Sequence, residues 1–150
     1  MTKKIIILGG NPETAALVDV ANKMGLYTIV IDPNPNAPAK KNAPETQDMD
    51  GFDVEGIVGF AKKNNVKAVM VGVEDIMVKP YREICEKLNV HSYATKEAIE
   101  AFSSKDGFKK YCAQYQIQDI PGIYLNGSSA IKKPKNLDYP LMIKPVDSGG

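Results

Sequence analysis

The chain has 150 residues, of which 43% are hydrophobic and 25% are charged, an ordinary composition for a soluble globular protein. Its 19 basic and 18 acidic side chains give a formal net charge of +1, which excludes a general attraction to nucleic acid or to a membrane surface. Cys85 and Cys112 have no partner at metal or CxxC spacing, so we expect reduced thiols and a cytoplasmic protein.

Strands and helices alternate along the first part of the chain. We predict strands over Lys4–Leu8, Tyr27–Ile31 and Ala68–Val73, with a short further strand starting at Val90. We predict helices over Thr14–Met24, Asp53–Asn64 and Asp75–Leu88. Pro33–Gln47 is rich in Pro, Asn and Ala, and predicts a long irregular loop. The order predicts an α/β fold, with a Rossmann-like parallel sheet and helices on both faces.

The residues from 94 onward show shorter elements. We predict helices from Thr95 to Phe102 and from Ser104 to about Tyr115, and strands over Ile123–Leu125 and Leu141–Lys144. These elements build no closed core of their own. We therefore predict one domain over residues 1–93 and the start of a second over residues 94–150.

A glycine-rich turn follows the first strand. The dinucleotide fingerprint G-x-G-x-x-G fails here, because its third position is Asn11 when counted from Gly9 and Pro12 when counted from Gly10. The turn can still present N–H groups at a helix N-terminus to a carboxylate or phosphate, or serve only as a tight turn. Asp32 ends the second strand, where a ribose-binding acid would lie. An NAD(P)-linked oxidoreductase with a degenerate fingerprint is therefore one alternative.

Two more segments carry charges at predicted strand ends. Glu74 and Asp75 follow the third strand, where they can contact a substrate. The alternative is that Asp75 caps the next helix and Glu74 interacts favourably with its dipole. Lys144 ends the last predicted strand, directly before a tail that becomes glycine-rich. An unpaired buried ammonium is costly, and a triphosphate would satisfy it; the alternative is a lysine in solvent.

In this order and spacing, the segments resemble the ATP-grasp superfamily. The quoted stretches are Asp32-Pro33-Asn34-Pro35-Asn36, Gly72-Val73-Glu74-Asp75, Ser104-Lys105-Asp106-Gly107-Phe108-Lys109, Ile120-Pro121, Tyr139-Pro140-Leu141-Met142-Ile143-Lys144-Pro145 and Val146-Asp147-Ser148-Gly149-Gly150. The resemblance implies a pre-ATP-grasp domain over residues 1–93 and a truncated N-terminal portion of the ATP-grasp domain over residues 94–150.

The resemblance also implies roles for single residues. Lys105 and Lys144 would contact ATP phosphates, and Gly10 and Glu74 would help to hold the acceptor substrate. The backbone N–H groups that face the terminal phosphates would come from Ser148, Gly149 and Gly150. No catalytic residue and no metal ligand is assigned, because the carboxylates that bind Mg²⁺ in this family are expected further downstream.

The implied activity is an ATP-dependent carboxylate–amine or carboxylate–thiol ligase, which acts on small molecules through an acyl-phosphate intermediate. The branch resembles proteins similar to the carbamoyl phosphate synthase large chain. We expect an N-terminal fragment of a longer enzyme that is inactive alone and binds ATP weakly. A homodimer is one expected arrangement. The remaining alternative is a non-catalytic module that binds a small ligand or mediates dimerisation.

Overall fold

The computed structural model describes residues 2–123, 125 and 137–145. The chain divides into two compact units, Met1–Ile99 and Glu100–Gly150, and each is described by itself. The predicted domain boundary after residue 93 stays a prediction. Within the described part of the chain, no helix combines the length and the apolar character needed to cross a membrane.

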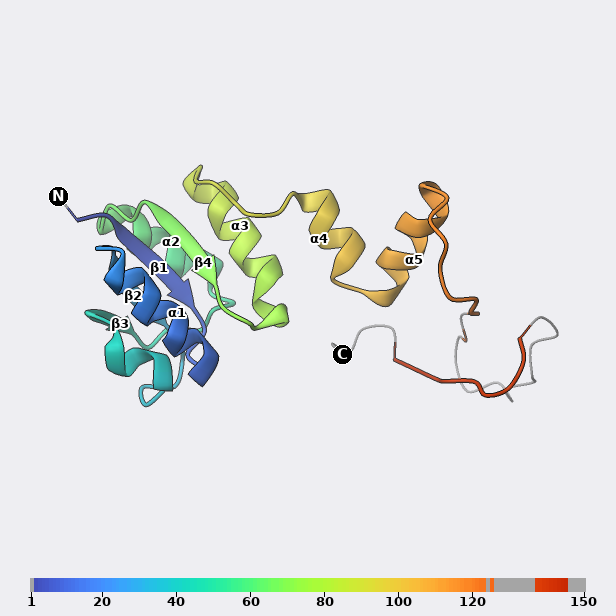
Figure 1. Cartoon of the computed structure of the whole chain (residues 1–150). Helices are drawn as coiled ribbons and strands as arrows, with labels where there is room; N and C mark the ends of the chain where they lie inside the picture. Colours follow the sequence, from blue (N-terminus) through green and yellow to red (C-terminus); the bar gives the residue numbers. More distant parts are fainter. Residues whose placement is uncertain (1, 124, 126–136, 146–150) are drawn as a thin grey trace. The chain divides into compact units, whose positions relative to one another are not determined.

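The first unit is built on a parallel sheet of four strands. These are β1 (Lys4–Leu8), β2 (Tyr27–Ile31), β3 (Glu45–Gln47) and β4 (Ala68–Val71). Their order is β3-β2-β1-β4, so β1 lies between β2 and β4 (Figure 1). The register places Ile6 opposite Ile29 on one side and Val69 on the other. This sheet confirms the predicted α/β class and its Rossmann-like order.

Helices cover both faces of the sheet. They are α1 (Pro12–Lys23), α2 (Val54–Lys63) and α3 (Val78–Leu88). Ile6 and Leu8 of β1 belong to the core that α2 and α3 complete, whereas Ile5 and Ile7 belong to the core that α1 completes. Alternate residues of a strand point to opposite faces, so both sets are buried. The unbroken apolar run of β1 therefore reflects a strand with two covered faces.

The N-terminus of α1 is fixed directly after β1. The side chain of Asn11 accepts a hydrogen bond from the backbone N–H of Thr14 at 2.7 Å, and Pro12 occupies the first helical position. Both features are favourable at a helix start, because they leave fewer N–H groups without a partner. The first turn of α1 is thus held at the carboxyl edge of the sheet.

Two sequence predictions in the first unit are wrong. Pro33–Gln47 is not irregular throughout, because it contains a 3-10 helix η1 (Pro38–Asn42) and strand β3. The sequence does not predict β3 because its residues are polar. An edge strand that pairs only with β2 can have few apolar side chains. No strand starts at Val90, because none of the four sheet strands pairs with the residues that follow α3.

Smaller differences concern element ends. β4 ends at Val71 rather than Val73. The predicted helix from Asp75 begins as a separate 3-10 turn η2 (Asp75–Met77), after which α3 starts at Val78. The earlier end of β4 leaves Gly72 and Val73 outside the strand, in a loop with Glu74 at the sheet edge.

The second unit is described mainly by two helices. α4 (Lys96–Phe102) spans the division between the units, and α5 (Lys105–Gln114) follows it. Both agree with the prediction. Ser104 caps α5 by accepting a hydrogen bond from the Gly107 N–H at 3.0 Å. The ring centroids of Phe102 and Tyr111 lie 5.2 Å apart, and this aromatic contact packs α4 against α5.

The predicted strand Leu141–Lys144 is wrong for this structure. Residues 137–145 contain no strand, and Met142 and Ile143 are 78% and 73% exposed. A strand needs a hydrogen-bonded neighbour, and none is present for this segment in the part of the chain that is described. Of the other predicted strand, Tyr124 lies outside the described residues, and Ile123 and Leu125 are not in a strand.

Candidate functional site

The candidate site lies at the carboxyl edge of the sheet in the first unit. Gly9 follows β1, Asp32 follows β2 and Glu74 follows β4 after two residues. Because the strands are parallel, their carboxyl ends meet at one edge. This edge is where ligands bind in open α/β sheets.

Gly9 allows Glu74 to approach the backbone closely. Its φ is +91°, a conformation that side-chain-bearing residues rarely adopt, and its N–H donates to the Ile31 carbonyl at 3.0 Å. A Cβ at this position would lie 2.7 Å from the carboxylate of Glu74. The carboxylate of Glu74 therefore rests directly against the glycine turn.

Gly10 makes a similar close contact with the loop after β2. A Cβ at Gly10 would collide with the Cβ of Ala37 and would lie 2.8 Å from the Asp32 carboxylate. The turn at Gly9 and Gly10 thus has a carboxylate beside each glycine. The structure brings together Gly10 and Glu74, the two residues that the sequence analysis assigned to the acceptor.

The carboxylate of Glu74 lies at the N–H groups of the turn, where the sequence alone suggests a site for a substrate carboxylate or phosphate. The backbone N–H groups of Asn11 and Gly10 face its carboxylate, which lowers its pKa. Burial and, second, the nearby Asp32 carboxylate raise the pKa of Glu74, and the net direction is upward. The side chain of Glu74 makes no cap bond to η2.

The end of α1 is packed tightly against β4 beside the site. A Cβ at Gly72 would collide with the Oγ1 of Thr14, whose side chain is fully buried. This Oγ1 is the one buried side-chain N or O atom without a hydrogen-bond partner in the described part of the chain. Only a residue without a Cβ at position 72 therefore leaves room for Thr14.

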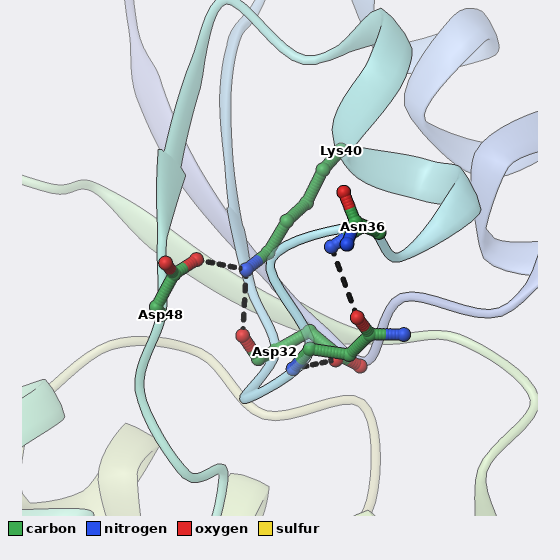
Figure 2. Close-up of polar contacts among 5 residues, drawn as sticks. Asp32, Asn36, Lys40 and Asp48 are labelled. Carbon is green, nitrogen blue, oxygen red and sulfur yellow. Dashed lines mark hydrogen bonds and ion pairs between the residues drawn. The ribbon is translucent and has the colours of Figure 1, made fainter.

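The loop after β2 is held by a buried lysine that the sequence analysis missed. The Nζ of Lys40 donates to the main-chain oxygen of Asp32 at 2.7 Å and pairs with the carboxylate of Asp48 (Figure 2). Within the loop, Asp32 Oδ1 accepts from the Asn34 N–H at 2.8 Å. Lys40 lies in a polar stretch that predicts exposed side chains, so no local signal distinguishes it from Lys41.

The nucleotide residues assigned from the sequence lie in the second unit. Lys105 is the first residue of α5 and is half-buried, and Lys144 is exposed in the extended segment 137–145. The other three assigned residues, Ser148, Gly149 and Gly150, lie outside the described residues. The assignment of all five to ATP therefore stays a proposal.

Two comparisons of the sequence, with a family model and with curated proteins, give matches. Residues 1–102 match the family described as the ribonucleotide synthetase preATP-grasp domain. In sequence, the chain is 27% identical over 153 residues to a phosphoribosylaminoimidazole carboxylase from Candida glabrata, which covers 95% of this chain and 25% of that protein. The chain thus spans about a quarter of the length of this curated relative.

Solved structures share the fold. A phosphoribosylglycinamide synthetase from Anaerococcus prevotii superposes with a TM-score of 0.66 at 24% identity, covering 77% of this chain and 30% of that one. An N5-carboxyaminoimidazole synthetase from Staphylococcus aureus, complexed with ADP, superposes with a TM-score of 0.62 at 21% identity, covering 77% of this chain and 31% of that one. At these identities the likeness shows the fold of this part of the chain.

Proposed function

The chain belongs to the ribonucleotide synthetase preATP-grasp domain family, and we propose that it is the N-terminal part of an ATP-dependent ligase. The family membership confirms the resemblance to the ATP-grasp superfamily seen in the sequence. In the proposed reaction, ATP phosphorylates a carboxylate, and an amine or thiol attacks the acyl phosphate. The chain spans only part of the length of its relatives, so this activity belongs to the whole protein.

We assign the sheet edge to the acceptor substrate. Carboxylates accept hydrogen bonds, so Asp32 and Glu74 suit the hydroxyl or amine groups of a small polar molecule. The names of two relatives above contain phosphoribosylaminoimidazole and phosphoribosylglycinamide, which favours a phosphoribosyl amine as the acceptor over the carbamoyl phosphate synthase type. The observation that carries the assignment is the Glu74 carboxylate held against Gly9 and Gly10.

We assign the nucleotide to the second unit. Lys105 is the first residue of α5, and the N-terminal end of a helix favours phosphate oxygens. An ATP phosphate bound there would meet the charge of Lys105, and Lys144 would add a second charge. ATP would supply the phosphoryl group. Among residues 2–123, 125 and 137–145, no cluster of three or more His, Cys, Asp or Glu side chains could hold a metal ion, so we assign no Mg²⁺ ligand there.

The oxidoreductase alternative is not favoured by the glycine turn. A dinucleotide pyrophosphate would need the N–H groups at the start of α1. Pro12 has no N–H, and the carboxylate of Glu74 already faces the N–H groups of Gly10 and Asn11. A pyrophosphate would have to displace a carboxylate that the chain itself provides, whereas a hydroxyl or amine would add to it.

The proposed function is tested with the protein that carries this chain together with its downstream sequence. ADP release is measured across a panel of small carboxylic acids and amines, including phosphoribosyl amines, at saturating ATP and Mg²⁺. We expect one acid–acceptor pair to raise ADP release about tenfold or more above ATP alone. If no pair raises it, and a nicotinamide cofactor binds instead, the oxidoreductase alternative replaces the ligase.

The 150-residue chain provides a second test. We propose that it neither hydrolyses ATP nor binds it tightly, because the proposed metal ligands lie elsewhere in the protein. Isothermal titration calorimetry checks this directly. Micromolar binding of ATP to the 150-residue chain would contradict the proposal.

A further inference from the structure

We propose that Lys40 is a positioning residue that fixes the Asp32 carboxylate beside Gly10 and Glu74. The inference rests on the proposed function of this edge as the acceptor site. Its test measures the carboxylates themselves and uses no substrate. A failed ligase assay and a failed test of Lys40 are therefore distinguishable.

Lys40 is buried to a degree that is unusual for lysine. Its side chain is only 5% exposed. Burying an ammonium lowers the stability of the fold by roughly several kcal/mol unless the group is paired and hydrogen-bonded. The two acceptors of its Nζ come from different strands, since Asp32 follows β2 and Asp48 follows β3. Figure 2 shows the side chain reaching from η1 to the point between them. Lys40 therefore ties the carboxyl ends of these two strands to η1.

The same helix contacts the glycine turn. The Ala39 N–H donates to the Gly10 carbonyl at 3.0 Å, and Ala37 packs so closely that a Cβ at Gly10 would collide with it. The carboxylate of Asp32 and the helix η1 both lie against Gly10. Lys40 links the two, because its Nζ bonds the main-chain oxygen of Asp32. A change at Lys40 alters the position of Asp32 without any contact between Lys40 and Glu74.

The consequence is a measurable coupling. Asp32 and Glu74 are like-charged neighbours, so the titration of Glu74 reports how close the Asp32 carboxylate lies. Without the Lys40 bond to its main-chain oxygen, Asp32 keeps its bonds to the Asn34 N–H and the Gln47 carbonyl but is held less firmly beside Gly10. We expect Glu74 then to be less sensitive to the charge of Asp32.

The test is a double-variant comparison on the 150-residue chain. The titration midpoint of the Glu74 carboxyl is followed by carbon-13 NMR in the wild type and in Asp32→Asn, and then in both with Lys40→Met added. The substitution D32N should lower the midpoint in the wild type. With K40M present, we expect that lowering to shrink by about half or more. Lys41→Met, in the same 3-10 helix but exposed, serves as the control and should leave the lowering unchanged.

An equal or larger lowering in the K40M background would overturn the proposal, even if K40M destabilises the protein, because a purely structural lysine would not change the coupling. If K40M does not fold, Lys40→Gln takes its place. This variant keeps a polar end that tolerates the burial of residue 40, but its shorter side chain loses the ammonium bond to the Asp32 oxygen. We expect the same loss of coupling, and an unchanged coupling in K40Q would also overturn the proposal.

Discussion

In the first unit the apolar residues of the predicted strands are buried on both faces of a sheet, whereas in the second unit those of Leu141–Lys144 are exposed. Ile6, Ile7 and Leu8 are fully buried between α1 on one side and α2 and α3 on the other. Ile143 has a similar local pattern and is 73% exposed. The difference teaches that an apolar run becomes a strand only where neighbouring strands pair with it.

The two units also differ in their candidate ligand residues. In the first unit Gly9, Gly10, Asp32 and Glu74 contact one another at a single sheet edge. In the second unit the described nucleotide residues are Lys105, on a capped helix, and Lys144, on an exposed segment. The proposed acceptor site can therefore be tested on the described residues, whereas the proposed nucleotide site can be tested only in the whole protein.

The largest expected effect contrasts the two apolar patterns. Ile6→Ala removes a fully buried side chain between β2 and β4 and should lower the free energy of unfolding by about 3 to 4 kcal/mol. Ile143→Ala removes an exposed side chain and should change it by less than about 0.5 kcal/mol. Urea unfolding of the 150-residue chain, followed by circular dichroism, measures both. Equal losses would contradict the contrast between the units.

The next effect concerns the glycine turn. Gly10→Ala introduces a Cβ that collides with Ala37 and crowds Asp32, so we expect a loss of about 1 to 3 kcal/mol. Gly59→Ala is the matched control, because it lies inside α2 and no atom lies within 4 Å of its added Cβ. That variant should gain roughly 0.5 to 1 kcal/mol from helix propensity. Thermal melting checks the opposite signs, and a neutral G10A would refute the close contact.

Helix caps in the two units give a smaller contrast. Asn11→Ala removes the bond to the Thr14 N–H and should cost about 1 kcal/mol of global stability, because α1 is part of the main core. Ser104→Ala removes the equivalent bond to the Gly107 N–H. We expect it to raise amide hydrogen exchange in α5 while β1 keeps its protection. Faster exchange in β1 in the S104A variant would show that the units unfold together.

The smallest expected effect is the pH dependence of Glu74. Its pKa is raised in the folded state above the ordinary value of 4.5, so the folded chain holds this proton more strongly than the unfolded chain. That stabilisation is complete below about pH 4.5 and is lost as the pH rises through the raised value. Glu74→Gln cannot titrate, so the wild type should lose stability relative to E74Q over this range. Parallel urea midpoints across the range would show that the pKa is not raised.

Much of the first unit was predictable from its sequence, for reasons that lie in local pattern. β1 and β2 have the predicted bounds because continuous apolar residues with strong breakers at their ends leave little choice. The predicted helix Thr14–Met24 overlaps α1, which Asn11 and Pro12 start two residues earlier. β3 could not be predicted, because its Glu-Thr-Gln sequence carries no strand signal and its pairing with β2 is set by the tertiary structure.

The candidate site was predictable only in part. Gly10 and Glu74 follow predicted strands, so the rule that ligands bind at carboxyl ends identified both. That rule does not reveal that Glu74 itself faces the N–H groups of the turn, since the contact joins residues 64 positions apart (74 − 10). The burial of Lys40 was not predictable for the same reason, because it depends on two strand ends that the sequence does not show to be adjacent.

The central claim, that this sheet edge binds the acceptor and not the nucleotide, is tested most directly by steady-state kinetics of Glu74→Gln. The assay uses the protein that carries this chain with its downstream sequence, with the acid–acceptor pair found by ADP release. Glu86→Gln, an exposed change on α3, is the control. We predict that E74Q raises the KM for the acceptor about tenfold or more and leaves the KM for ATP within about twofold. A raised KM for ATP with an unchanged KM for the acceptor would contradict the account.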